Sequence, residues 1–229
     1  MDIQKAKEEI KNTLAAYLQK DADGNYCYPL VNQRPLLLIG PPGVGKTAIV
    51  EQAAREAGLP MVAYTMTHHT RQSAVGLPKI TERDYCGQHF SVTEYTMSEI
   101  IGTVYAAMDR SGKKEGILFL DEINCVSETL APTMLQFLQN KTFGTHALPL
   151  GWIIVAAGNP PEYNKSVREF DVVTLDRIRW ISVEASVEAF LDYGAAAGLH
   201  GAVLSFLGLK PEKFYHVSRQ EDQLHYVTA

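Results

Sequence analysis

Short apolar runs alternate with longer amphipathic stretches along most of the chain. Unbroken apolar runs are typical of strands that are buried on both faces, and they occur at residues 35–39, 61–65, 117–120, 152–157 and 178–183. Apolar side chains recur at helical spacing in the stretches at residues 2–20, 48–57, 98–109 and 127–139. Strands that alternate with helices indicate an α/β fold, with a parallel sheet covered on both faces.

The pattern changes in two places before the chain ends. Residues 66–91 are polar and rich in Gly and Pro breakers, which predicts a long, irregular and mobile insertion on the surface. Residues 142–150 are expected to form a small hairpin around Gly144. From residue 186 onward the spacing is helical. We therefore expect an αβα core over residues 1–185 and the beginning of a helical unit over residues 186–229.

Composition and charge narrow the class of protein. The net charge is −5, and no basic run exceeds two residues, which argues against a nucleic-acid interface. Three widely spaced cysteines fit neither a disulfide framework nor a zinc cluster, and we expect free thiols in a cytoplasmic protein. His68, His69 and His89 are expected to be exposed loop residues rather than metal ligands. No window approaches a membrane span, and the first residues do not resemble a signal peptide.

A phosphate-binding loop lies between the first predicted core strand and the helix that follows it. Its pattern is G-x-x-x-x-G-K-T, and the strand–loop–helix context is the one that this motif requires. Glycines let backbone N–H groups surround a polyphosphate, the lysine reaches the β- and γ-phosphates, and the threonine hydroxyl binds Mg²⁺. The residues expected to bind ATP are Gly40, Pro41, Pro42, Gly43, Val44, Gly45, Lys46, Thr47 and Ala48.

The same residues allow a second interpretation. Residues 43–48 also match G-x-G-x-x-A, the looser dinucleotide-binding fingerprint. Such a site needs an acidic residue near the end of the second strand to hold a ribose hydroxyl. Residues 61–68 contain no acid, so we favour the triphosphate site.

Three further positions supply the chemistry of phosphate hydrolysis. Asp121 and Glu122 follow an apolar strand, so that Asp121 is expected to hold Mg²⁺ and Glu122 to orient or deprotonate the attacking water. Asn159 follows another buried strand, and its amide is placed to contact both the γ-phosphate and that water. Arg177 is the candidate for stabilising charge on the transferred phosphoryl group, with Arg168 and Arg179 as rivals.

These motifs recur in the order found in AAA+ ATPases, which the chain resembles over about residues 30–185. Within that superfamily it is similar to the MoxR-like and dynein-related branch. The resemblance rests on the phosphate-binding loop, on Leu120-Asp121-Glu122-Ile123-Asn124, on Ala156-Ala157-Gly158-Asn159-Pro160 and on Leu175-Asp176-Arg177. Gly76-Leu77-Pro78 and Leu148-Pro149-Leu150-Gly151-Trp152 add to it.

The resemblance implies a P-loop NTPase core with a five-stranded parallel sheet in the order 5-1-4-3-2, followed by a helical lid. It also implies a ring, usually of six subunits, in which Lys46, Thr47, Asp121, Glu122 and Asn159 act within one subunit. Arg177 would act on the nucleotide of the neighbouring subunit. Protein partners in this branch often carry a von Willebrand A-type domain, and residues 66–91 would face the ring pore or such a partner.

The sequence departs from the branch at two points. Cys125 stands where a basic residue commonly follows Asp-Glu-Ile-Asn, and no second arginine sensor appears in the lid. We favour a lid that continues past residue 229 over a degenerate one.

The leading function is a Mg²⁺-dependent ATPase that remodels or assembles partner proteins. A nucleic-acid motor or loader, a small-molecule kinase and a nucleotide switch without turnover are the alternatives. Glu122 and Asn159 disfavour the kinase, and Glu122 disfavours the switch.

Overall fold

The computed structural model describes residues 1–163, 167, 170, 172–220 and 223–227. A five-stranded parallel sheet forms its centre, in the order β2-β5-β8-β1-β9. Numbered among themselves along the chain, these strands give the expected order 5-1-4-3-2, which confirms the predicted core. Their bounds are β1 Leu36–Ile39, β2 Met61–Thr65, β5 Gly116–Asp121, β8 Trp152–Gly158 and β9 Arg179–Ser182.

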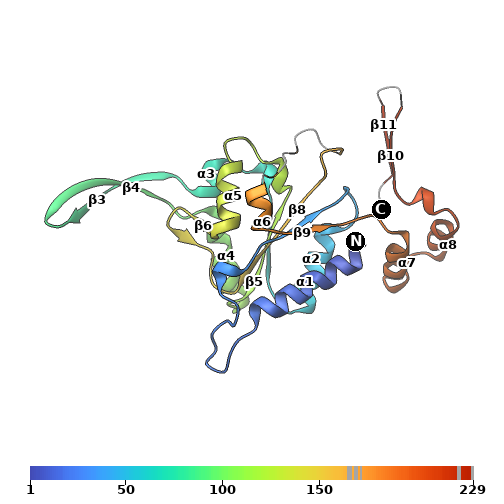
Figure 1. Cartoon of the computed structure of the whole chain (residues 1–229), viewed down its shortest axis with the longest axis horizontal. Helices are drawn as coiled ribbons and strands as arrows, with labels where there is room; N and C mark the ends of the chain where they lie inside the picture. Colours follow the sequence, from blue (N-terminus) through green and yellow to red (C-terminus); the bar gives the residue numbers. More distant parts are fainter. Residues whose placement is uncertain (164–166, 168–169, 171, 221–222, 228–229) are drawn as a thin grey trace.

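Helices cover both faces of the sheet (Figure 1). One face carries α1 (Ile3–Leu18) and α2 (Lys46–Glu56), and the other carries α4 (Glu99–Ser111) and α5 (Ala131–Asn140). Successive residues of β1 point to opposite faces, so that Leu36 packs with α1 and α2 whereas Leu37 packs with α4 and α5. Both faces are therefore apolar, and the strands read as continuous hydrophobic runs.

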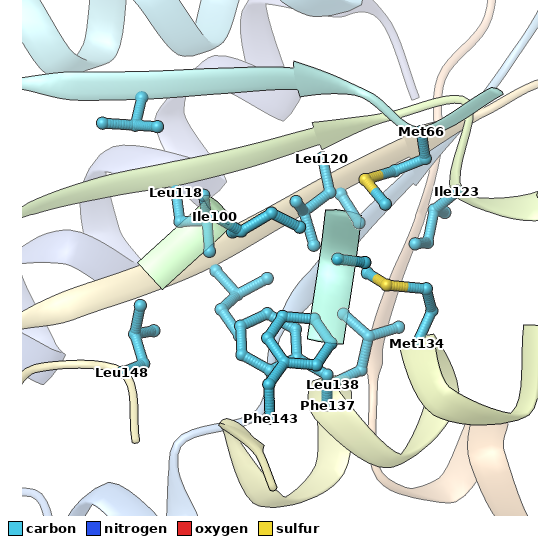
Figure 2. Packing of buried hydrophobic residues seen from close by; sticks show 14 of the residues in the cluster. Met66, Ile100, Leu118, Leu120, Ile123, Met134, Phe137, Leu138, Phe143 and Leu148 are labelled. Atoms are coloured by element: carbon cyan, nitrogen blue, oxygen red, sulfur yellow. The ribbon is translucent and has the colours of Figure 1, made fainter. Parts of the chain in front are cut away.

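The cluster beneath α4 and α5 is the larger of the two cores. Phe137 of α5 stacks on Phe143, with ring centroids 3.9 Å apart, and both side chains are at most 1% exposed. Figure 2 shows the pair packed below Leu118 and Leu120 of β5, next to Met134. Phe143 lies in the short hairpin of β6 (Thr142–Phe143) and β7 (His146–Ala147), which confirms the hairpin predicted around Gly144.

The start of α5 was predicted wrongly. Its position before an apolar helical pattern predicts Ser127 as the cap of this helix, but the backbone N–H groups of Leu130 and Ala131 both donate to the Ser127 carbonyl and form a separate turn. The helix begins at Ala131, with Pro132 in its first turn, where the missing N–H of proline costs no hydrogen bond.

The polar stretch after β2 is a surface insertion, as predicted, but its secondary structure is regular rather than irregular. It contains η2 (Met66–His68), α3 (Arg71–Val75) and an antiparallel hairpin of β3 (Pro78–Tyr85) and β4 (Gln88–Tyr95). The hairpin projects away from the sheet (Figure 1). Most of its side chains are exposed, so no apolar alternation marks its strands, and eight cross-strand pairs define it instead.

Beyond β9 the chain forms α7 (Val187–Ala196) and α8 (Gly201–Leu209), followed by η4 (Pro211–Lys213). The hairpin of β10 (His216–Gln220) and β11 (Gln223–Val227) comes last. These elements lie on the side of the sheet near α1 and α2, opposite to the β3–β4 hairpin (Figure 1). The remaining short elements are η1 (Leu30–Asn32), η3 (Ile123–Cys125) and α6 (Val172–Asp176). None of the helices described is both long enough and apolar enough to span a bilayer.

Removing the Phe137 ring should destabilise the fold strongly. Phe137→Ala opens a cavity in a close-packed cluster, and we expect a loss of about 3–5 kcal/mol in the free energy of unfolding. Urea unfolding followed by far-UV circular dichroism measures it. Val31→Ala is the control, because Val31 is 87% exposed and should change stability by less than about 0.5 kcal/mol. Equal effects of the two changes would contradict the assigned packing.

Candidate nucleotide-binding site

The phosphate-binding loop joins β1 to α2 at the carboxyl edge of the sheet. Gly43 and Gly45 have φ of 78° and 90°, a left-handed conformation that glycine adopts without strain. A Cβ atom on Gly40 would lie 2.4 Å from the carbonyl oxygen of Val183, so the loop also needs glycine at this close approach to β9. The loop ends at the N-terminus of α2, where backbone N–H groups and the helix dipole favour an anion.

Lys46 is 8% exposed and closes the loop on itself. Its Nζ donates to the carbonyls of Gly40 at 2.7 Å and Pro41 at 2.8 Å, and to Oδ1 of Asn159 at 2.9 Å. Burial lowers the pKa of Lys46 to about 8, although the Asp121 carboxylate acts in the opposite direction. The structure therefore brings together the lysine and the amide that were predicted from separate motifs.

The two carboxylates after β5 have different neighbours. Asp121 accepts a hydrogen bond from the Thr47 hydroxyl at 3.3 Å, which places the two predicted Mg²⁺ ligands side by side. Glu122 has φ of 56°, and its carboxylate accepts a hydrogen bond from Thr67 Oγ1 at 2.6 Å. The Thr47 hydroxyl and the Asp121 carboxylate are oxygen ligands, the type that Mg²⁺ prefers.

Thr67 and Asn124 contact site residues, although neither was predicted as a site residue from the sequence. Thr67 belongs to η2, directly after β2, and reaches Glu122 across 55 positions of the chain. Asn124 is 4% exposed, and its Nδ2 donates to the carbonyl oxygen of Asn159 at 2.8 Å. The sequence did hold a signal for Asn124, because this polar residue ends the Asp-Glu-Ile-Asn segment directly after a buried strand. Thr67 gave none, because its contact depends on the pairing of β2 with β5.

The candidate arginines occupy different surroundings. Arg177 is exposed at the corner between α6 and β9, and its Nη1 donates to Oε1 of Gln139 at 2.5 Å. Arg179 is engaged elsewhere, since its guanidinium pairs with Glu9 of α1 and also bonds Thr13. Both arginines thus have a partner within the chain, and the choice between them stays a prediction. Arg168 lies outside the described residues.

A cavity of about 910 Å³ opens beside the phosphate-binding loop. Its walls come from the first turns of α1, from Gly43, Val44 and Gly45 of the loop, and from α7, with Phe214 closing one side. The cavity is large enough for a small organic ligand. Its position next to the loop provides space for the nucleoside of a bound nucleotide.

The residues present fit ATP and Mg²⁺. Gly43 and Gly45 adopt the left-handed conformation of the loop, and a Cβ atom on Gly40 would clash with Val183. Lys46 supplies a cation, and Thr47 and Asp121 supply adjacent oxygen ligands. The individual roles of these side chains stay predictions. No group of three or more metal-ligating residues occurs in the described part of the chain. Cys27 and Cys86 are exposed free thiols there, and Cys125 is half-buried.

Gly158 should tolerate no side chain. A Cβ atom at this position would lie 2.4 Å from Oδ1 of Asn124, so Gly158→Ala displaces the amide that supports Asn159. We expect a loss of about 1–3 kcal/mol in unfolding free energy from this overpacking, measured by urea titration.

A double-mutant cycle tests the clash between a side chain at position 158 and Asn124. In an Asn124→Ala background the loss caused by Gly158→Ala should shrink, because the clashing group is gone. Gly201→Ala is the matched control, since nothing lies within 4 Å of a Cβ atom there. An unchanged penalty in the Asn124→Ala background would refute the assigned clash.

Comparisons with known proteins agree with this geometry. Residues 36–175 match the ATPase family associated with various cellular activities (AAA). The chain is also 28% identical over 191 residues to Lon protease 2 of Borreliella burgdorferi (strain ATCC 35210 / DSM 4680 / CIP 102532 / B31), in an alignment that covers 78% of the chain. It spans about a fifth of the length of that protein, at 20%. The family match runs from β1 into α6 and includes the phosphate-binding loop, Asp121, Glu122 and Asn159, but not Arg177, so the chain belongs to the AAA ATPase family.

Proposed function

We propose that the chain binds ATP with Mg²⁺ and hydrolyses the γ-phosphate. The observation that carries this proposal is the meeting of Lys46 Nζ with Asn159 Oδ1, 2.9 Å apart, beside the contact of Thr47 with Asp121. These side chains follow β1, β8 and β5, which are neighbours in the sheet. The carboxyl edge of the sheet therefore carries the proposed phosphate-binding cation, the metal-binding pair and the γ-phosphate contact.

Each residue has a distinct task in this proposal. Lys46 holds the β- and γ-phosphates, Thr47 and Asp121 hold the metal, and Asn159 contacts the γ-phosphate and the water. Glu122 orients or deprotonates that water. Mg²⁺, when bound, neutralises charge on the phosphate oxygens. Thr67 fixes the Glu122 carboxylate through the 2.6 Å hydrogen bond.

We further propose that the chain works in a ring of the MoxR-like type and acts on protein partners. Two features of the chain support the proposal of a ring that acts on protein partners. Arg177 is exposed and is held by Gln139, and no described contact links it to the loop of its own subunit. The β3–β4 hairpin presents Ile80, Tyr85 and Phe90 to solvent, which are 75%, 53% and 44% exposed. The rings of Tyr85 and Phe90 lie 6.2 Å apart, and exposed apolar residues that lie together suit a protein interface.

The similarity to Lon protease 2 supports only the ATPase part of the proposal, because it covers a fifth of that protein. Proteolysis is outside the proposal.

Adding candidate proteins or DNA to an ATPase assay separates a protein-remodelling role from a nucleic-acid role. Stimulation of hydrolysis by DNA, and not by protein, would contradict the protein-directed part.

Two substitutions separate binding from hydrolysis. Lys46→Ala should abolish tight ATP binding, because the loop loses its cation. Glu122→Gln keeps the loop intact and should bind ATP but stop turnover. Equilibrium binding of a fluorescent ATP analogue and phosphate release measure the two steps. Wild-type hydrolysis by Glu122→Gln would show that Glu122 has no catalytic role.

Arg177→Ala should remove most of the turnover and leave nucleotide affinity nearly unchanged, because the arginine would act on the neighbouring subunit. An arginine supplied in trans contributes about 10³- to 10⁵-fold in related phosphoryl-transfer enzymes. Mixing Arg177→Ala with Lys46→Ala subunits should restore part of the activity, since the second variant still offers Arg177. The assay is run at concentrations where light scattering detects assembly. Mixing without any recovery in assembled protein would exclude action in trans.

A further inference from the structure

Two consecutive aromatic residues after α8 contact the cavity beside the phosphate-binding loop and the segment after β8. Phe214 lines the cavity beside the phosphate-binding loop and packs on Phe190 of α7, with ring centroids 5.0 Å apart. Phe214 is 7% exposed. A nucleoside that fills the cavity would therefore lie against this ring, and its position would depend on how α7 and Phe214 pack.

The next residue, Tyr215, contacts a different segment of the chain. Its ring meets that of Tyr163 edge to face, with centroids 6.5 Å apart and an interplanar angle of 71°. This geometry is favourable for aromatic pairs and lies near the outer end of their distance range. Tyr163 and Tyr215 are distant in sequence, so the contact joins the segment after α8 to the segment after β8.

The hydroxyl of Tyr215 is buried. Burial, together with the hydrogen-bonding and charge influence of the neighbouring Tyr163 phenol, raises the pKa of Tyr215 to about 12. The Tyr215 side chain is therefore placed by its contact with Tyr163.

Tyr163 is coupled to Asn159 by a tight turn. The backbone N–H of Tyr163 donates to the carbonyl oxygen of Pro160 at 3.1 Å, and two consecutive prolines, Pro160 and Pro161, restrict the backbone between them. The turn thus fixes the Tyr163 backbone relative to Pro160, the residue that follows Asn159. Asn159 is itself held from the other side by Lys46 and Asn124.

We propose that Tyr163 and Tyr215 are positioning residues for Asn159, which link the filling of the nucleoside cavity to the placement of the γ-phosphate contact. The inference rests on the proposed ATPase function. A nucleoside packed on Phe214 fixes the adjacent Tyr215, Tyr215 fixes Tyr163, and the proline turn carries that position to Asn159. The arrangement favours triphosphates that carry a base over those without one.

Hydrolysis by ring-deletion variants tests the link. Tyr215→Ala should lower kcat for ATP by about 10- to 100-fold, as expected when a catalytic contact is misplaced by about 1 Å. Equilibrium affinity for a fluorescent ATP analogue should stay close to that of the wild type. Tyr163→Ala should have the same effect, and the double variant should be no slower than either single variant, because both changes break one contact.

Conservative variants and a distant tyrosine provide the controls. Tyr215→Phe and Tyr163→Phe keep the rings and should retain most of the rate, even if an alanine variant folds poorly. Tyr105→Ala removes a 43% exposed ring on α4 and should leave kcat unchanged. An unchanged kcat in Tyr215→Ala would overturn the proposal, as would additive effects or a loss of affinity at constant kcat.

A second measurement works without hydrolysis. In nucleotide-free protein labelled with ¹⁵N-asparagine, Tyr215→Ala should shift the Asn159 signals, whereas Tyr105→Ala should not. Asn159→Ala identifies those signals. Shifts in a protein that neither binds nor hydrolyses ATP would support the link and contradict the ATPase function. Unshifted signals would overturn the link, whatever the outcome for hydrolysis.

Discussion

One buried ammonium group ties the candidate site together. Lys46 Nζ bonds two carbonyls of its own loop and the side chain of Asn159, so it fixes the loop after β1 against the end of β8. These three acceptors satisfy the buried cation. A triphosphate has to replace these neutral acceptors, and it can do so because charged oxygens are stronger acceptors than carbonyls. The loop is therefore shaped in advance by the same charge that would hold the phosphates.

The core and most of the site could be predicted because their signals are local. The run Leu36–Ile39 is apolar throughout, the glycine loop follows it at once, and Asp121 ends an equally apolar strand. Each motif could be recognised within a few residues, and the parallel sheet then places the ends of neighbouring strands at one edge. The expected sheet order came from the family resemblance, and the strand pairing confirms it.

The remaining features depend on contacts between distant segments. Thr67 reaches Glu122, and Tyr163 meets Tyr215, only after the chain has folded. The β3–β4 hairpin was missed because exposed strands need no apolar alternation, and its two-residue turn contains Cys86 with φ of 52°, an uncommon conformation for a residue other than glycine. Ser127 resembled a helix cap in sequence, but its carbonyl oxygen, and not its side chain, receives the N–H groups of the turn before α5.

The hairpin of β3 and β4 is a long two-stranded arm that projects from the core (Figure 1). Eight residues at about 3.4 Å each give an arm of roughly 27 Å. Its root is clamped by paired hydrogen bonds, since Leu77 N–H donates to Thr96 Oγ1 and Thr96 N–H donates to the Leu77 carbonyl, both at 2.9 Å. A rotation of about 10° at this root would carry the tip through about 5 Å at the same rise per residue. A small rotation at Leu77 and Thr96 would thus be amplified into a displacement of the tip as large as a side chain.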